Sequence, residues 1–553
     1  MMNITMGKLL AMQAQRYAEH EAVVYPFENI RWTYSEFNAK VEQIAKGMIK
    51  IGIKKNDHVA IWATNVPEWL LCQFATAKIG AVLVTVNTNY KAFELEYLLK
   101  QSDVSTLVMT SGFKDSDYIK ILNNLCPELK DSQPGHLRSA KFPFLRNIIY
   151  IGDEKYQGMY AFDELYELGE LVSDKYLDHI QNSLSPHDVI NMQYTSGTTG
   201  FPKGVMLTHY NIINNGDAIA KCMNLSYEDR LCIPVPFFHC FGCVLGVMAC
   251  VTHAATMVSL DHFNPIKVMK IVEKEQCTAL HGVPTMFISM LESDEFNKFN
   301  FSSLRTGIMA GSLCPVKIMK QVVDKMNMKE ITIAYGQTEA APVITQTRAD
   351  DPIYIRVSTV GRPLPGVEVK IVDPETKEEL PNGVQGELIA KSYGIMKGYY
   401  KMEEATKMVI DEDGWLHTGD LAVMDDRGYC KITGRLKDMI IRGGENIYPR
   451  EIEEFLYTHP AIQDAQVIGV PDKKYGEEIM ACIILKKNIE NPPNEDDIIE
   501  FVRGGLSRFK CPKYVWFVEE YPLTASGKVQ KYKLREMAIA KLNLHEEASI
   551  EIA

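Results

Sequence analysis

Residues 189–204 read VINMQYTSGTTGFPKG, a short apolar run followed by a loop rich in glycine and hydroxyl side chains. Between residues 194 and 204 lie three glycines, four serine or threonine hydroxyls and one lysine. Glycine lets backbone N–H groups converge on anionic oxygens, hydroxyls donate further hydrogen bonds, and lysine supplies a positive charge. The composition predicts a loop that grips a polyphosphate, although such clusters are also typical of solvated surface loops.

The spacing of this loop differs from that of the P-loop of nucleoside triphosphatases. Five positions after Gly197 stands Pro202, where a P-loop has the glycine that precedes its lysine. Lys203 is followed by Gly204, and not by the Ser or Thr that would bind magnesium. The segment is therefore predicted to be a phosphate loop of another kind.

Apolar strands and amphipathic helices alternate on both sides of this loop. A capping box at Thr33 and Glu36 opens a predicted helix, and continuous apolar runs at 59–63 and 81–86 predict buried strands. Such strands separated by helices predict an α/β fold with a mostly parallel sheet. From about residue 366 short alternating strands predict a β-rich subdomain, and a compact α+β segment follows a break at 434–438.

The bulk properties are those of an ordinary globular protein. At 553 residues the chain exceeds what one hydrophobic core supports, so two or more domains are expected. The net charge of -12 argues against a nucleic-acid partner. No apolar stretch approaches the roughly 20 residues that cross a bilayer, and residues 1–20 lack the pattern of a signal peptide. The expected location is the cytoplasm.

The cysteines show no disulfide framework. Twelve of them are scattered along the chain, which predicts free thiols in a reducing compartment. Cys240 and Cys243 form a CxxC next to His239, but the sequence offers no second cluster for a zinc site. Two interpretations of this pair stay open: a redox dithiol, or two small packed hydrophobic side chains.

Residues 194–204 resemble the signature loop of the adenylate-forming superfamily, which includes acyl-CoA synthetases, luciferases and the adenylation domains of peptide synthetases. Further segments resemble family motifs in the family order, at 234–242 (PVPFFHCFG), 334–339 (AYGQTE), 415–420 (WLHTGD), 434–435 (GR), 442–449 (RGGENIYP) and 522–528 (PLTASGK). The resemblance covers the chain from about residue 10 to 540 and is greatest to the medium-chain fatty acid–CoA ligase branch.

This resemblance implies an AMP-forming ligase that joins a carboxylic acid to coenzyme A through an acyl-adenylate, using ATP and Mg²⁺. Residues 1–434 would form the ATP- and acyl-binding domain, 435–438 the hinge around Lys437, and 439–553 a small mobile domain. Gly443 and Gly444 would line the CoA tunnel, because adjacent glycines allow close approach by a narrow thiol arm. Aryl-CoA ligation, acyl transfer to a carrier protein and a non-catalytic binding protein remain alternatives, and the oligomeric state is open.

The implied ATP site draws on several of these motifs. Tyr335 would lie against adenine, Asp420 and Arg435 would bind the ribose, Thr338 would contact the α-phosphate, and Glu339 would hold Mg²⁺. The complete set of implied ATP-binding residues is Thr195, Ser196, Gly197, Thr198, Thr199, Gly200, Phe201, Pro202, Lys203, Gly311, Ser312, Tyr335, Gly336, Asp420, Arg435 and Lys528.

Lys528 is the implied catalytic lysine, acting with Thr338 and Glu339. Attack of a carboxylate on the α-phosphate brings two anions together, and a cation that bridges them lowers the barrier. The alternative is an ordinary surface lysine, since Lys531 and Lys533 follow closely.

The resemblance places the acyl pocket at His239, Val283, Ala310 and Gly336. Amino-acid-activating relatives carry an aspartate where His239 stands, and a buried ammonium without a carboxylate partner is costly. An α-amino acid is therefore not the expected substrate. Acetate-activating relatives place a tryptophan where Gly336 stands, so the glycine would leave room for a longer acyl tail; a turn glycine is an equal alternative.

Overall fold

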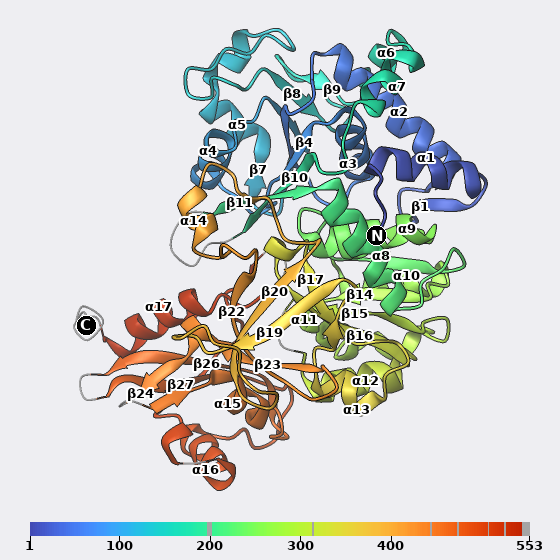
Figure 1. Ribbon diagram of the computed structural model, residues 1–553. Coiled ribbons are helices and arrows are strands. Elements are labelled where there is room, and N and C mark those ends of the chain that lie inside the picture. Colours follow the sequence, from blue (N-terminus) through green and yellow to red (C-terminus); the bar gives the residue numbers. More distant parts are fainter. Residues whose placement is uncertain are drawn as a thin grey trace.

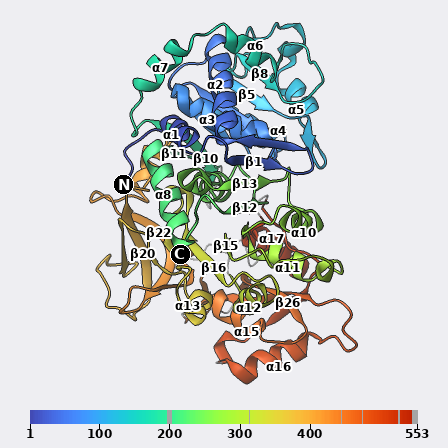
Figure 2. The same cartoon turned by 90° about the vertical axis from the view of Figure 1, so that its right-hand side faces the viewer.

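A computed structural model describes residues 1–195, 202–311, 314–442, 445–472, 475–506, 508–524 and 527–544. These residues form two large sheets, two smaller sheets and a two-stranded hairpin (Figure 1). The C-terminal sheet and its helices, coloured orange and red, lie below the N-terminal sheet in both views (Figures 1 and 2).

The first large sheet has eight strands in the order β21-β11-β10-β4-β3-β5-β8-β9. The strands from β10 to β9 run parallel, whereas β11 and β21 are antiparallel at one edge. Its elements are β3 (His58–Trp62), β4 (Val82–Thr85), β5 (Thr106–Met109), β8 (Asn147–Tyr150), β9 (Tyr160–Ala161), β10 (Val189–Thr195), β11 (Lys203–Thr208), β21 (Gly398–Tyr399), α2 (Tyr34–Lys50), α3 (Pro67–Ile79), α4 (Ala92–Gln101), α5 (Tyr118–Leu125), α6 (Glu164–Glu170) and α7 (Asp174–Asn182). Strands β3 and β4 confirm the two apolar runs predicted to be buried.

Helix α2 begins as its sequence predicts. The Thr33 hydroxyl accepts a hydrogen bond from the Glu36 backbone, and the Glu36 carboxylate accepts one from the Thr33 backbone, so the capping box is complete. The apolar face of the helix, which includes Phe37, Val41 and Ile44, is fully buried. The capping box fixes the start of the helix, and its buried apolar face packs mainly against α3 and α6.

The glycine-rich loop of the sequence connects two antiparallel strands. β10 ends at Thr195 and β11 begins at Lys203, and these two residues pair across the hairpin. A P-loop instead leads from a strand into a helix, so the strand pairing agrees with the spacing argument. The predicted phosphate-binding residues Ser196, Gly197, Thr198, Thr199, Gly200 and Phe201 lie outside the described residues.

The second large sheet has nine strands in the order β18-β17-β16-β15-β14-β12-β13-β1-β2, parallel from β16 to β1. Its elements are β1 (Glu21–Tyr25), β2 (Ile30–Thr33), β12 (Arg230–Ile233), β13 (Thr256–Ser259), β14 (Ala279–Gly282), β15 (Thr306–Ala310), β16 (Glu330–Gly336), β17 (Val343–Gln346), β18 (Arg362–Pro363), α1 (Met6–Arg16), α8 (His209–Cys222), α9 (Ala249–His253), α10 (Pro265–Lys274), α11 (Pro284–Leu291), α12 (Val316–Lys325) and α13 (Ile353–Ser358).

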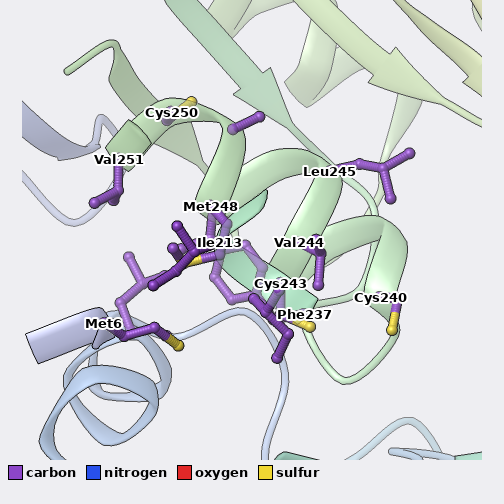
Figure 3. Packing of buried hydrophobic residues seen from close by; sticks show 14 of the residues in the cluster. Met6, Ile213, Phe237, Cys240, Cys243, Val244, Leu245, Met248, Cys250 and Val251 are labelled. Atoms are coloured by element: carbon purple, nitrogen blue, oxygen red, sulfur yellow. The ribbon is translucent and has the colours of Figure 1, made fainter. Parts of the chain in front are cut away.

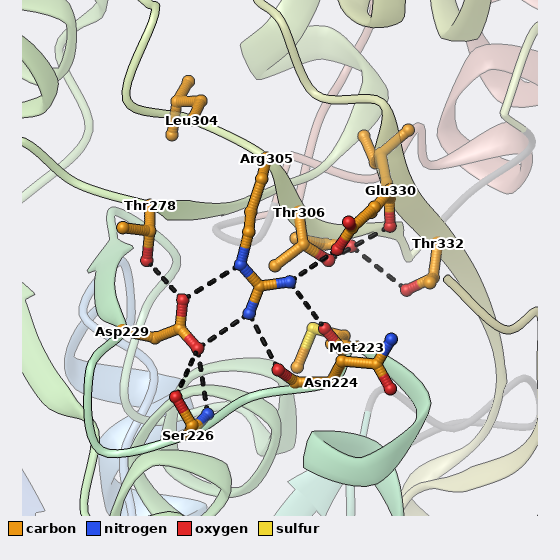
Figure 4. Close-up of polar contacts among 12 residues, drawn as sticks. Met223, Asn224, Ser226, Asp229, Thr278, Leu304, Arg305, Thr306, Glu330 and Thr332 are labelled. Atoms are coloured by element: carbon orange, nitrogen blue, oxygen red, sulfur yellow. Dashed lines mark hydrogen bonds and ion pairs between the residues drawn. The ribbon is translucent and has the colours of Figure 1, made fainter. Parts of the chain in front are cut away.

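A charged network ties the amino ends of three of these strands (Figure 4). Arg305, just before β15, donates to both oxygens of Asp229, at 3.1 and 2.7 Å, and to Glu330 at 2.5 Å. It also donates to the carbonyl oxygens of Met223 and Asn224. Asp229 precedes β12 and Glu330 begins β16, so the network fixes the strands at one edge and leaves the other edge for a site.

A π-helix, η2 (Phe241–Met248), follows β12 and packs mainly against α8 and α9, with Met6 of α1 in the same apolar cluster (Figure 3). Cys240 and Cys243, at 4% and 0% exposure, pack here, with Cys243 beside Phe237 in Figure 3. All twelve cysteines are free thiols. The packing agrees with the interpretation of this pair as small hydrophobic side chains.

The two smaller sheets follow in sequence. The four-stranded antiparallel sheet contains β19 (Val367–Val372), β20 (Gly386–Ser392), β22 (Leu416–Met424) and β23 (Cys430–Arg435), with α14 (Glu403–Lys407) between β20 and β22. After the short η5 (Leu436–Asp438), the C-terminal sheet contains β24 (Ile440–Arg442), β25 (Glu445–Ile447), β26 (Ile462–Asp472), β27 (Gly476–Leu485) and β28 (Tyr514–Phe517), with α15 (Pro449–Leu456), α16 (Glu495–Gly505) and α17 (Lys531–Leu542). The C-terminal sheet has its own apolar core. The predicted fold class, including the β-rich subdomain and the small C-terminal α+β domain, is confirmed.

Candidate active site

The predicted motifs meet at the carboxyl edge of the nine-stranded sheet. Strands β12, β14, β15 and β16 are neighbours there, and the chain continues from their ends into the predicted site residues. These residues are His239 after β12, Val283 after β14, Ala310 and Gly311 at the end of β15, and Tyr335 and Gly336 at the end of β16. Ligands of open α/β sheets bind at this edge.

Asp420 lies at the centre of the predicted ribose site. Tyr335 donates to its Oδ2 at 2.8 Å, and Arg435 donates through Nε to its Oδ1 at 2.8 Å. The Asp420 side chain is 5% exposed, whereas the Arg435 side chain is 51% exposed and keeps a face to solvent. Asp420 raises the pKa of Arg435, while burial and the same carboxylate raise the pKa of Tyr335. Both partners therefore remain donors to a fixed carboxylate.

Local backbone geometry and one buried acid support Asp420. Gly419 has a φ of +70°, a left-handed conformation that glycine adopts without strain. The Gly419 N–H donates to Oε1 of Glu387 at 3.1 Å, and Oε2 of Glu387 is hydrogen-bonded to Nδ1 of His417 at 2.9 Å. Sequence reasoning missed Glu387, which is 3% exposed. The available sequence signal was an acidic residue beside the apolar residues of a predicted strand.

Glu339 lies in the short helix η4 (Thr338–Ala340), with the other implied catalytic residue of this motif, Thr338, at its start. Its Oε1 accepts a hydrogen bond from the hydroxyl of Tyr399 at 2.7 Å. The ammonium of Lys203 lies 4.9 Å from the centre of the Tyr399 ring. The end of the predicted phosphate loop and the predicted metal ligand are therefore linked through one side chain.

Lys528 reaches the same edge from the segment between β28 and α17. Gly527 has a φ of +80°, and two hydrogen bonds, at 2.7 and 3.0 Å, join Thr524 to Lys528. A Cβ on Gly311 would lie 3.4 Å from Cε of Lys528 and 3.1 Å from Cγ1 of Val283. The φ of Gly311, +94°, and the closer contact with Val283 favour glycine here, and the Lys528 side chain lies beside this glycine.

The charged groups around Lys528 are Arg435, Asp420 and Glu339, all of them residues of the predicted ATP site. Protein atoms crowd the lysine on several sides while solvent still reaches it, and this partial desolvation lowers its pKa. The positive charge of Arg435 lowers the pKa further, and the carboxylates of Asp420 and Glu339 oppose both effects. Lys437, the predicted hinge residue in η5, faces the same charges, and burial and Arg435 lower its pKa.

His239 borders this group on the side of the predicted acyl pocket. Burial, and then the charge of Lys528, lowers its pKa to about 3, so the ring is neutral at physiological pH. Its Nε2 is buried and has no hydrogen-bond partner among the described residues. A neutral imidazole cannot replace the aspartate that would pair with a substrate ammonium.

Close packing of the backbone explains why residue 336 is a glycine. A Cβ at this position would lie 1.9 Å from the carbonyl oxygen of Pro342, closer than real Cβ contacts come. Close backbone approach therefore requires glycine here, whatever the depth of the acyl pocket.

Three further predicted residues, Ser312, Gly443 and Gly444, lie outside the described residues. Pro202 is described, and its carbonyl oxygen accepts a hydrogen bond from the Tyr97 hydroxyl at 3.1 Å. Within the described ranges, no helix is long and apolar enough to cross a membrane. No cluster of three or more His, Cys, Asp or Glu in the same ranges is arranged to hold a metal ion.

Comparisons with known proteins agree with this geometry. The chain matches the AMP-binding enzyme family over residues 10–400 and the AMP-binding enzyme C-terminal domain over residues 451–528. It is 59% identical over 98% of both chains to YngI of Bacillus subtilis (strain 168), which is provisionally named an acyl-CoA synthetase. It is 42% identical to the mitochondrial medium-chain acyl-CoA ligase ACSF2 of Bos taurus, covering 98% of this chain and 89% of that protein. The crystal structure of ATP-bound MatB from Rhodopseudomonas palustris is 28% identical, with a TM-score of 0.82 over 97% of this chain and 99% of that one.

The chain therefore belongs to the AMP-binding enzyme family. Membership of the adenylate-forming superfamily, expected from the motifs, is confirmed. The expected reaction class, ATP-dependent ligation of a carboxylic acid to CoA, is confirmed as well.

Proposed function

We propose that this protein activates medium-chain fatty acids, producing acyl-CoA, AMP and pyrophosphate in two half-reactions. The proposal depends on the proximity of Lys528, Glu339 and the Asp420 carboxylate. These residues come from distant parts of the chain: Glu339 follows β16, Asp420 lies in β22, and Lys528 lies between β28 and α17. The medium-chain preference is supported by the 42% identity to medium-chain acyl-CoA ligase ACSF2.

In the first half-reaction, a carboxylate oxygen of the fatty acid attacks the α-phosphorus of ATP, and the bond to pyrophosphate breaks. Asp420 accepts hydrogen bonds from the ribose hydroxyls while Tyr335 and Arg435 hold its carboxylate in place. The ammonium of Lys528 lies between the attacking carboxylate and the α-phosphate, where it stabilises the charge that both anions bring. Lys203 holds the β- and γ-phosphates, which leave together.

Glu339 fits the role of a ligand to Mg²⁺. Its Oε1 is engaged by Tyr399, whereas its Oε2 has no hydrogen bond or ion pair within the described part of the chain. Mg²⁺ prefers carboxylate and phosphate oxygens and keeps several waters. When bound, the ion supplies positive charge that neutralises the phosphates.

In the second half-reaction, the CoA thiol attacks the acyl carbon and AMP leaves. Substrate carboxylate and thiol are the nucleophiles, so the enzyme needs no nucleophilic side chain of its own. We expect residues 439–553 to rotate about Lys437, withdrawing Lys528 and bringing Gly443 and Gly444 to the thiol arm, while residues 1–434 keep the adenylate. A cytoplasmic location is part of the proposal.

The decisive experiment measures CoA-dependent AMP release with acetate, octanoate, palmitate, benzoate and a cinnamate. The highest kcat/KM is expected with octanoate. A preference for benzoate or the cinnamate would favour an aryl-CoA ligase, and replacement of CoA by a phosphopantetheinylated carrier protein tests the other acceptor. No AMP with any acid would mean a non-catalytic binding protein.

A further inference from the structure

Tyr399 contacts two residues on which the phosphate end of the proposed site depends. Its hydroxyl donates to Oε1 of Glu339 at 2.7 Å, and its ring lies under the ammonium of Lys203, 4.9 Å from the centroid. The side chain is 6% exposed. Tyr399 belongs to none of the motifs that the sequence singled out.

The backbone holds Tyr399 firmly in this position. Strand β21 pairs antiparallel with β11, the strand that leaves the phosphate loop, with Tyr399 opposite Val205. The Tyr399 N–H donates to the hydroxyl of Thr406 at 2.9 Å, and the next residue, Tyr400, donates to the carbonyl of Gly204 at 2.8 Å. Tyr399 is therefore fixed to the same strand pair as Lys203, while Glu339 comes from the nine-stranded sheet.

The hydroxyl of Tyr399 engages one of the two oxygens of the Glu339 carboxylate, because it donates to Oε1 at 2.7 Å. Oε1 is therefore the oxygen that Tyr399 holds in place. The other oxygen, Oε2, makes no hydrogen bond or ion pair within the described ranges and is the one available to a cation.

We propose that Tyr399 is a positioning residue for the metal–nucleotide complex: its hydroxyl orients Glu339 so that Oε2 faces Mg²⁺, and its ring restrains the ammonium of Lys203. The inference rests on the proposed function, because it assumes that Glu339 binds the metal and Lys203 the phosphates. It assigns Tyr399 to the first half-reaction only, since neither partner is required once pyrophosphate has left.

Two substitutions separate the two contacts. Tyr399→Phe removes the hydroxyl and keeps the ring under Lys203, so metal binding should weaken while nucleotide binding without metal stays the same. Tyr399→Leu removes both contacts. Loss of an outer-shell partner of a metal ligand typically costs roughly 10-fold or more in metal affinity, and loss of a partly desolvated cation–π contact roughly three- to ten-fold in affinity for the cation's ligand.

The test measures Mn²⁺ binding by electron paramagnetic resonance in the presence of α,β-methylene-ATP, which cannot be cleaved to an adenylate. The dissociation constant for Mn²⁺ should rise roughly 10-fold in Tyr399→Phe. Metal-free binding of the analogue should weaken in Tyr399→Leu but not in Tyr399→Phe. In a Lys203→Met background, Tyr399→Leu should have no further effect on metal-free binding.

Tyr400→Phe is the matched control, because it removes a hydroxyl–carboxylate bond of the same kind, from Tyr400 to Asp103 at 2.8 Å, one residue away. Its Mn²⁺ affinity should equal that of the wild type. Thioester formation from preformed octanoyl-adenylate should be unchanged in Tyr399→Phe, which shows that the variant is folded.

Unchanged Mn²⁺ affinity in Tyr399→Phe, or an equal loss in Tyr400→Phe, would overturn the role of Tyr399 while leaving the proposed function intact. Failure of the wild-type protein to bind the Mn²⁺–analogue complex would instead overturn the proposed function, and the role of Tyr399 with it.

Discussion

Replacing Lys528 with alanine should separate the two half-reactions. The lysine faces Arg435, Asp420 and Glu339 in a crowded site, where its charge is screened less than in bulk water. Removal of one preorganised donor to transition-state charge typically costs about 10²–10³-fold in rate, or about 3–4 kcal/mol. Adenylation should fall by that factor, whereas thioester formation from preformed octanoyl-adenylate should not change.

The assay measures ATP–pyrophosphate exchange for the first half-reaction and acyl-CoA formation from synthetic octanoyl-adenylate for the second. Lys533→Ala is the control, because this lysine lies on α17, five residues further along the chain, against its neighbour Tyr532. It should match the wild type in both assays. Equal loss of the two half-reactions in Lys528→Ala would refute the assigned role.

The same residue predicts a pH dependence. An ordinary lysine has a pKa near 10.5, and the pKa of Lys528 is lowered from that value. Its ammonium therefore loses its proton at a lower pH. Adenylation in the wild type should therefore decline as the pH rises through this lowered value. Lys528→Arg stays protonated throughout and should show no such decline, whatever its absolute rate. If the adenylation rate declined at the same pH in both proteins, the titrating group would be a residue other than Lys528.

Three further predictions concern the hinge, one glycine and one buried acid. Lys437→Pro should preserve pyrophosphate exchange and abolish CoA transfer, because proline fixes φ at the predicted pivot; unimpaired CoA transfer would remove Lys437 from that role. Gly336→Ala should lower the melting temperature, since its Cβ would lie 1.9 Å from the Pro342 carbonyl oxygen and overpacking costs about 1–3 kcal/mol. An unchanged melting temperature with a shift to shorter acids would favour the pocket interpretation. Burial raises the pKa of Asp464, in β26, to about 6. The protonated side chain therefore stabilises the folded state fully below the unfolded pKa, near 4, and this stabilisation is lost as the pH rises through about 6. Asp464→Asn, which stays neutral, should gain in melting temperature over the wild type between pH 4 and 7, and a pH-independent difference would contradict the shifted pKa.

Features encoded in short segments were predictable from the sequence. The capping box at Thr33 and the buried strands β3 and β4 each depend on residues within a few positions of one another. The resemblance to family motifs also predicted Asp420, Arg435 and Lys528 as residues of one site. The structure brings these three together.

Contacts between distant segments were not predictable in this way. Tyr335 and Asp420 are 85 positions apart, and Glu339 and Tyr399 are 60 apart, yet each pair shares a hydrogen bond. Periodicity and spacing report only on neighbours along one element, so they cannot show which strands become adjacent. The close approach at Gly336 was missed for the same reason, because the carbonyl oxygen that a Cβ would meet belongs to Pro342, directly before the next strand, β17.

The division of the nine-stranded sheet into two edges has a consequence for altering substrate choice. The Arg305 network fixes the amino ends of β12, β15 and β16, at the opposite ends of these strands from the proposed ligand-binding residues. We therefore expect that mutant libraries confined to the proposed pocket positions Val283 and Ala310 vary the acid accepted while the opposite ends keep the strands in register. Libraries that include Asp229, whose side chain is 5% exposed and accepts from Arg305, would instead disturb this register.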